Sequence, residues 1–294
     1  MKRVWKRAGF LVCAAASAIC LGGCSHKELS WEKEITEETI YVEGLEGEYT
    51  LLFLTDSHVV IQEEDAPEQE RQYVAQRYEQ FVNEAGVPSA EQFPEWIAYA
   101  NEMEVDAVLL GGDIIDSPSG ANVEWLQTQL AQLDMPYLYV PGNHDWTYPW
   151  EYMTDYGKDN YLAGLEPLMQ DNAAIHSIEA GELLLVGVNN SPGQVDPDAM
   201  PIYEELLAQN KPVILLFHVP YSSETLLPKA LEAWNSPTVI GNGDQGGIWP
   251  DEASQRFLEL ATADSSPVGL MLAGHVHLYD DSVINEERQM RQIV

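Results

Sequence analysis

Short aliphatic runs recur along this chain, and longer segments with helically spaced apolar residues separate them. The runs hardly alternate between apolar and polar residues, which is typical of strands buried on both faces. Strands are expected at residues 50–55, 107–110, 137–140, 213–217 and 268–273. Helices are expected at residues 69–85, 90–103, 122–133, 200–209, 226–234 and 252–262. This alternation of strands and helices predicts an α/β fold of packed sheets.

Weaker patterns predict a few further elements. A strand pair is expected at 175–178 and 183–188, a single strand at 39–42 and a last strand at 290–294. Residues 146–171 are interpreted as an aromatic loop with short helices. Because no internal repeat and no linker interrupts residues 48–294, we interpret them as one domain.

The N-terminus has the layout of an export signal. Four basic residues precede an apolar stretch that is short for a membrane span of about 20 residues. The stretch ends in Leu21-Gly22-Gly23-Cys24, which resembles a bacterial lipoprotein signal whose cysteine is lipidated. We therefore expect a signal peptide at 1–23, an acidic tether at 24–47 and a lipid on Cys24 that holds the exported protein at the cell membrane or cell surface. An ordinary cleaved signal and an uncleaved anchor are the alternatives.

The positions of the cysteines and the net charge limit the kinds of partner that this protein is expected to bind. All three cysteines lie at or before position 24, so no disulfide can form within the processed chain and no disulfide-linked partner is expected. The formal charge of −34 disfavours nucleic acid and anionic lipid faces as partners. The charge is interpreted as a solvated exported surface. A small anionic substrate is still compatible with it, because bound dications would reverse the local field.

Five short polar blocks follow the predicted strands and hold five of the seven histidines. They are Asp56-Ser57-His58, Gly111-Gly112-Asp113, Gly142-Asn143-His144-Asp145, His218 and Gly274-His275-Val276-His277. Imidazole and carboxylate are the ligands of first-row divalent metals. A lone histidine such as His218 is a core residue in most proteins, but its place directly after a strand favours a ligand. The blocks therefore predict a metal site in loops held by a rigid sheet.

In this order the blocks resemble the calcineurin-like metallophosphoesterase superfamily, whose signature is D-x-H, G-D, G-N-H-D/E, H and G-H-x-H. The resemblance implies a four-layer αββα sandwich of two mixed β-sheets flanked by helices, with a dimetal site at the strand ends. It implies that one metal is bound by Asp56, His58 and His277, that the other is bound by Asn143, His218 and His275, and that Asp113 bridges both. Nitrogen and oxygen ligands of this kind admit Mn, Fe or Zn.

The resemblance also implies a dinuclear metallophosphoesterase in which a hydroxide activated by the two metals attacks phosphorus. His144 would protonate the leaving group, and Asp145 would orient His144. Asp116 is interpreted either as an acceptor for a ligand histidine or as an ordinary turn residue.

One departure from the family's sequence pattern limits the class of substrate that is expected. Members that act on phosphoproteins carry an arginine soon after the G-D block, but Ser117-Pro118 stands here. A small extracytoplasmic phosphomonoester or phosphodiester is therefore expected as the substrate. The alternative is a surface lipoprotein that binds metal or a partner without catalysis.

Two loops could border a substrate pocket. One carries an aromatic cluster that forms either core or pocket wall: Trp146, Tyr148, Trp150, Tyr152 and Tyr156. The other is glycine-rich, at 241–247, and is interpreted as a rim loop, because it lacks the lysine of a phosphate-binding loop. Asn189-Asn190-Ser191 follows a predicted strand and is either structural or part of the pocket.

Overall fold

The computed structural model describes residues 31–63, 67–147, 152–169, 172–236, 238–241, 243 and 247–294. Thr36–Val294 form one compact unit, distinct from Met1–Ile35. The predicted signal peptide and Cys24 lie outside the described residues. Within these described ranges, no helix combines the length and the apolar character that crossing a membrane requires.

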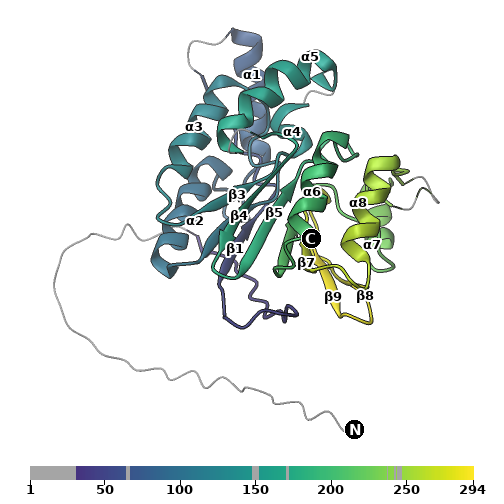
Figure 1. Ribbon diagram of the computed structural model, residues 1–294. Helices are drawn as coiled ribbons and strands as arrows, with labels where there is room; N and C mark the ends of the chain where they lie inside the picture. The colour runs from purple at the N-terminus through teal and green to yellow at the C-terminus, as the bar shows by residue number, and fades with distance from the viewer. Residues whose placement is uncertain are drawn as a thin grey trace, which may run out of the picture. The chain divides into compact units, whose positions relative to one another are not determined.

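The first half of the compact unit contains a small sheet of three strands (Figure 1). Its order is β1 (Leu51–Leu54), β2 (Ala107–Leu110) and β3 (Tyr137–Tyr139). Both pairings are parallel, so the carboxyl ends of the three strands meet at one edge. The central strand β2 is buried along its whole length, which explains its unbroken aliphatic run.

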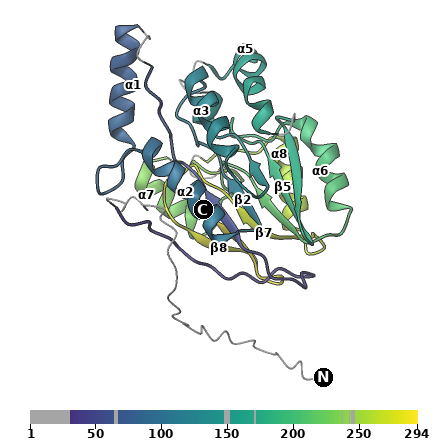
Figure 2. The same cartoon turned by 90° about the vertical axis from the view of Figure 1, so that its left-hand side faces the viewer.

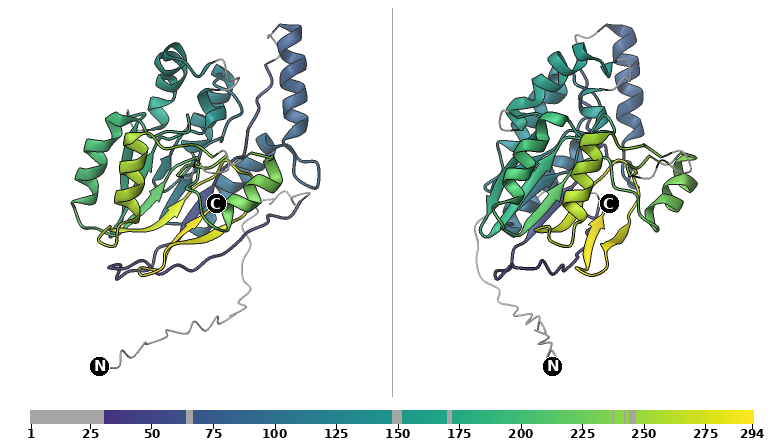
Figure 3. Two further views of the ribbon diagram at one scale, coloured as in Figure 1. Left: turned by 90° about the vertical axis from the view of Figure 1, so that its right-hand side faces the viewer. Right: turned by 45° about the vertical axis from the view of Figure 1, so that its right-hand side comes forward.

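A large sheet of six strands carries the second half, in the order β4-β5-β6-β7-β9-β8. The strands are β4 (Ile175–Ala180), β5 (Leu183–Val188), β6 (Val213–Leu216), β7 (Val268–Leu272), β8 (Asp281–Asn285) and β9 (Met290–Ile293). The β4–β5 and β8–β9 pairs are antiparallel and the inner pairs are parallel, so this sheet is mixed. The β8–β9 hairpin (yellow) forms one edge of the sheet (Figure 3).

Three hydrophobic cores separate four layers. The middle core joins the facing sides of the two sheets, where Leu109 and Leu138 belong to the same cluster as Leu185 and Leu216. The outer core of the small sheet includes residues of α2 (Ser89–Met103) and α3 (Gly120–Leu130). That of the large sheet includes residues of α6 (Met200–Leu207), α7 (Leu226–Trp234) and α8 (Glu252–Thr262). The expected α/β sandwich is confirmed, with the difference that the small sheet is parallel in each described pairing.

The remaining helices lie in the segments that connect these strands and helices. They are α1 (Glu68–Gln80), α4 (Asn143–Trp146), α5 (Asp155–Gly157), the π-helix η2 (Lys158–Leu162) and the 3-10 helices η3 (Ala163–Leu168) and η4 (Pro197–Ala199). Helix α1 extends away from α2 and α3 in Figure 2, and its first described residues are exposed. Its last turn points back toward β1, which brings Arg77 and Phe81 close to the Asp56–His58 block.

Two sequence expectations differ from the structure. Residues 39–42 do not form a strand, although Val42 is buried against Gly269, where an added Cβ would lie 2.4 Å from the valine. Strand β8 was not expected, because its polar residues Asp281, Ser282 and Asn285 break the apolar pattern that marks the other strands. The last expected strand is confirmed as β9.

Candidate dinuclear metal centre

The two sheets bring the five polar blocks together. Asp56 and His58 follow β1, Asp113 follows β2, and Asn143 opens α4 after β3. His218 follows β6, and His275 and His277 follow β7. Two sets of side chains each place one ligand atom per residue within 4.8 Å of the others. The sets are Asp56, His58, Asp113 and His277, and Asp113, His218 and His275.

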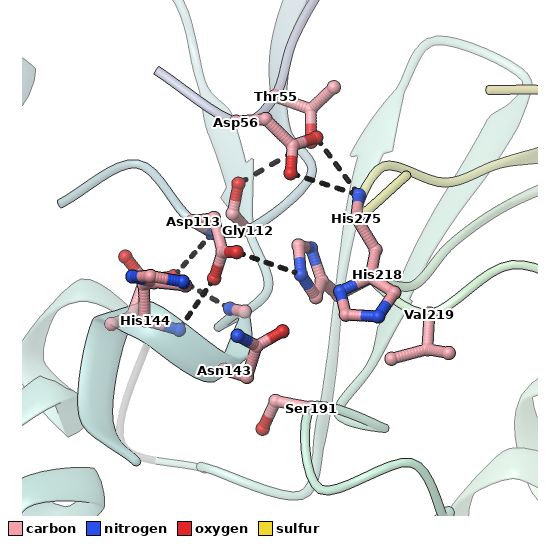
Figure 4. Close-up of polar contacts among 12 residues, drawn as sticks. Thr55, Asp56, Gly112, Asp113, Asn143, His144, Ser191, His218, Val219 and His275 are labelled. Carbon is pink, nitrogen blue, oxygen red and sulfur yellow. Dashed lines mark hydrogen bonds and ion pairs between the residues drawn. The ribbon is translucent and has the colours of Figure 1, made fainter. Parts of the chain in front are cut away.

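Asp113 belongs to both sets, and Figure 4 shows its carboxylate facing His218. Its Oδ2 atom lies 3.8 Å from Nε2 of His58 and 3.3 Å from Nε2 of His218. Its Oδ1 atom accepts a hydrogen bond from the backbone N–H of His144 at 2.7 Å. A carboxylate in this position faces one histidine of each set, which is the arrangement that a bridging ligand needs.

Unpaired buried atoms test whether cations fit this centre. Among the described residues, Nε2 of His218 and Oδ1 of Asn143 are buried without a hydrogen-bond partner. Nδ1 of His218 donates to the carbonyl oxygen of Gly111 at 2.8 Å, so in the neutral ring Nε2 is the nitrogen with the free lone pair. Buried acceptors rarely lack partners, and a cation would satisfy both. The residues present therefore fit a pair of metal ions.

The ligand atoms of the first set, which includes Asp56, His58 and His277, also lie close together. Nε2 of His58 and Nε2 of His277 lie 3.0 Å apart, and Nε2 of His277 lies 3.3 Å from Oδ1 of Asp56. The backbone N–H of His275 donates to both oxygens of Asp56, at 2.9 and 3.0 Å, which fixes that carboxylate. The nitrogen and oxygen atoms of this set thus face one point.

The backbone at the centre is held in an unusual conformation. Five of the candidate ligands have positive φ angles between 43° and 74°: Asp56, His58, Asp113, His275 and His277. Such left-handed conformations cost energy in residues other than glycine and persist where the surrounding structure enforces them.

Glycines in the blocks allow close approach of the backbone. A Cβ on Gly142 would lie 2.1 Å from Oδ1 of Asp113, and a Cβ on Gly112 would lie 2.6 Å from Nδ1 of His218. Gly112 also has a φ of +90°. Any larger residue at either position would displace a candidate ligand.

The buried charges shift one another's proton affinities. Burial raises the pKa of Asp56, but the hydrogen bond to His277 and the charge of His218 outweigh it, so the pKa is lowered. Burial lowers the pKa of His218, and the neighbouring Asp113 carboxylate reverses this and raises the pKa to about 9. Burial together with the charge of His218 lowers the pKa of His275 to about 4. Neutral His275 is the form that can ligate a cation.

Asp145 does not orient His144, which corrects the expectation from the sequence. Its Oδ2 accepts from the backbone N–H of Gly142 at 2.6 Å and of Asp113 at 2.8 Å, and its Oδ1 accepts from Ile115 at 2.9 Å. Burial and the charge of Asp113 raise the pKa of Asp145 to about 7, against the effect of these amides. Asp145 therefore holds the G-D and G-N-H-D loops together.

The carboxylate beside His144 is that of Asp116. Its Oδ1 lies 2.9 Å from Nδ1 of His144 and 3.2 Å from Nδ1 of His58, which confirms that Asp116 contacts a candidate ligand histidine. The guanidinium of Arg77 contacts both oxygens of Asp116 at 2.6 Å. Burial raises the pKa of Asp116, but hydrogen bonds from Arg77, His144 and His58 hold it well below its usual range. His58, Asp116 and His144 could also be grouped as metal ligands, but Arg77 already supplies the positive charge there.

The predicted pocket residues lie in different environments. Trp146 is buried and donates from Nε1 to Ser191 at 2.7 Å, so it belongs to the core. Oδ1 of Asn190 accepts from the backbone N–H groups of His218 and Val219, so that residue supports the centre. Tyr148, Trp150 and most of the 241–247 loop lie outside the described residues.

Two further tyrosines of the predicted aromatic cluster lie within the described residues. Tyr152 stacks on Tyr161, and Tyr156 is 65% exposed. Trp234, which the sequence did not single out, meets the ring of His277 at 5.5 Å and donates from Nε1 to the carbonyl oxygen of Val276. No motif marks Trp234, because it is the last residue of α7 and lies far from the blocks in sequence.

The sandwich and the shared carboxylate define a class of proteins built to hold two cations at the ends of two packed sheets. The profile of the calcineurin-like phosphoesterase family matches residues 49–279, and the chain belongs to this family. The family uses two divalent metal ions, in agreement with the two ligand sets.

Two curated relatives, both uncharacterized metallophosphoesterases of Helicobacter pylori, are each 27% identical to this chain. One, from strain J99, aligns over 203 residues, and the other, from strain 26695, over 199 residues. Each alignment covers 66% of this chain and 44% of the relative, so the chain matches less than half the length of these proteins.

Solved structures with a similar chain path include two phosphatases. A dimetal phosphatase from Danio rerio gives a TM-score of 0.47 at 14% identity, over 83% of this chain and 86% of that chain. The purple acid phosphatase PPD1 from yellow lupin seeds gives a TM-score of 0.46 at 15% identity, over 79% of this chain and 38% of that chain.

Proposed function

We propose that this protein is a metal-dependent phosphoesterase that hydrolyses a phosphomonoester or phosphodiester of a small extracytoplasmic molecule. The single observation that carries the proposal is the position of Asp113, whose Oδ2 faces His58 of one ligand set and His218 of the other. Membership of the calcineurin-like phosphoesterase family supports the reaction class.

The candidate ligands would bind two metal ions. Asp56, His58 and His277 would hold one cation, and Asn143, His218 and His275 the other, with Asp113 between them. Bound cations of this kind supply Lewis-acid stabilisation of the phosphoryl oxygens and activation of the attacking water. The acidic surface would otherwise repel such a substrate, so the cations would also reverse the local field.

His144 is the candidate acid for the leaving group. An ionised Asp116 only accepts hydrogen bonds, so the contact at 2.9 Å requires a proton on Nδ1 of His144. Nε2 of His144 is then the atom that gives a proton to the departing oxygen. The backbone N–H of His144 donates to Asp113, which keeps the acid next to the shared carboxylate.

An assay of the full-length protein in detergent tests the reaction. The protein is loaded with Mn²⁺, Fe²⁺ or Zn²⁺ in separate samples and offered phosphate monoesters and diesters of small alcohols and phenols. We expect metal-dependent release of the alcohol or phenol, and a chelator should abolish it. Protein that binds two metal ions and cleaves no ester would support the alternative, a non-catalytic metal-binding lipoprotein.

The lipid anchor on Cys24 is part of the proposal and has its own test. Cells that express the protein are fed a labelled fatty acid, and the label on the purified chain is measured. The label should be present in the native protein and in the matched control Cys20→Ser, and absent in Cys24→Ser. Equal labelling of Cys24→Ser would exclude Cys24 as the anchor.

A further inference from the structure

Arg77 lies outside every motif block, yet its guanidinium is built into the candidate centre. It lies in the last turn of α1, 39 residues before Asp116, and its side chain is 13% exposed. Its Nε donates to Oδ2 of Asp116 and its Nη2 to Oδ1, each at 2.6 Å. Two parallel hydrogen bonds fix the plane of a carboxylate, which a single point charge does not do.

The plane of Asp116 matters because Oδ1 also receives two imidazoles. Nδ1 of His58 lies at 3.2 Å and Nδ1 of His144 at 2.9 Å. Since an ionised carboxylate only accepts, both histidines carry their proton on Nδ1, and Nε2 of His58 faces Asp113 and His277. A rotation of this one carboxylate would therefore misalign a candidate ligand and the candidate acid together.

A second set of contacts ties Arg77 to the same histidines. Its Cζ lies 4.7 Å from the ring centroid of Phe81, and Phe81 stacks on His58 at 4.5 Å with an interplanar angle of 6°. The ring of His58 meets that of His144 at 4.5 Å and 87°. The guanidinium thus supports the two rings through a hydrogen-bonded path and through a stacked path.

We propose that Arg77 is a positioning residue, which sets the orientation of His58 and His144 together by holding Asp116 at two points. The kinetic part of this inference rests on the proposed phosphoesterase function, whereas the part that concerns His58 and metal affinity does not. An arginine that only fastens α1 to the body would change stability without affecting either histidine.

Three variants separate these readings. Arg77→Met keeps an aliphatic stem over Phe81 and loses the guanidinium. Arg77→Lys keeps the charge and loses the two-point contact. Arg71→Gln removes a positive charge from an exposed position of the same helix and is the matched control.

The first measurement is calorimetric titration of the metal-free proteins with Mn²⁺, which needs no turnover. Loss of a group that orients a ligand typically costs 10–100-fold in metal affinity, so we expect about a tenfold loss at one of the two sites in Arg77→Met. Arg77→Lys should fall between Arg77→Met and the native protein, and Arg71→Gln should match the native protein.

The second measurement is the ratio of kcat for an alkyl phosphate to kcat for 2,4-dinitrophenyl phosphate, whose leaving group needs no protonation. Since general acid catalysis supplies about 100-fold or more, a misaligned acid should lower this ratio about tenfold in Arg77→Met, with KM little changed. Native affinity at both sites together with a native ratio would overturn the proposal, even in a less stable variant. If the native protein cleaves neither these monoesters nor the phosphodiesters of the assay above, the proposed function fails, and an unchanged Mn²⁺ affinity in Arg77→Met would then overturn the role of Arg77 by itself.

Discussion

The two sheets contribute different chemistry to one centre. The loops after the small sheet supply the carboxylates Asp56 and Asp113 and the amide of Asn143, whereas the loops after β6 and β7 supply only imidazoles. Each ligand set takes residues from both sheets, so the packing of the middle core is what assembles the centre. The small sheet therefore contributes the carboxylate charge that retains cations, and the large sheet contributes imidazoles that complete each position.

The largest loss of activity is expected on substitution of Asp113, the residue of the small sheet that belongs to both ligand sets. Asp113→Asn removes the shared charge, and we expect hydrolysis to fall at least about 1000-fold, because the cations supply several kcal/mol of stabilisation. Turnover of an aryl phosphate and metal content per chain are the measurements. The matched variant His275→Ala, from the large sheet, should lose one metal ion and keep the other. Equal metal content in the two variants would contradict the division between the sheets.

The candidate acid His144 also lies on the small sheet's side of the centre. The effect of removing it on kcat should depend on the leaving group. His144→Ala should lower kcat about 100-fold for an alkyl phosphate, since the variant lacks the group proposed to protonate the departing oxygen. The same variant should change kcat for 2,4-dinitrophenyl phosphate far less. A uniform loss on both esters would show that His144 is not the acid.

Asp145 should behave as a structural residue of the same loops. Asp145→Asn places an amide NH₂ against at least one backbone N–H, and we expect a loss of about 3 kcal/mol in the free energy of unfolding. Urea unfolding measures this loss. The ratio of alkyl to dinitrophenyl turnover should stay at the native value, and a fall like that of His144→Ala would restore the orienting role to Asp145.

The corrected role of Asp145 shows where sequence analysis reaches its limit. The strand ends and ligand blocks were predictable, because aliphatic runs and D-x-H or G-H-x-H patterns are local. Asp145 is next to His144 in sequence, but adjacent residues of the helical turn α4 point in different directions. Asp116 reaches His144 through the tertiary fold from a position 28 residues away in sequence, and Arg77, 67 residues from His144, contacts Asp116. No local pattern carries that contact.

His176 is the counterpart of the histidines in the centre. It lies in β4, and its buried Nε2 has no partner among the described residues, as for His218, but no carboxylate is within reach to favour its charged form. Burial lowers the pKa of His176 to about 4. Because the folded pKa is below the ordinary value of 6.5, the unfolded chain binds the proton more tightly. His176 thus removes stability as the pH falls from 6.5 toward 4.

The pH dependence of stability through His176 is the smallest of the expected effects. Between pH 7 and pH 4.5 the native protein should lose about 2 kcal/mol through His176, since each pKa unit is worth about 1.4 kcal/mol. His176→Leu should lack that share of the loss. Urea unfolding of both proteins without added metal, at the two pH values, isolates the difference. The same pH dependence in both proteins would mean that His176 is not held neutral by the fold.

The most direct test of the shared carboxylate is a crystal structure of the protein grown with Mn²⁺, with anomalous scattering measured to locate the metal. The account predicts two peaks, one among Asp56, His58 and His277 and one among Asn143, His218 and His275, with an oxygen of Asp113 in contact with both. A single peak, or a peak among His58, Asp116 and His144, would contradict it.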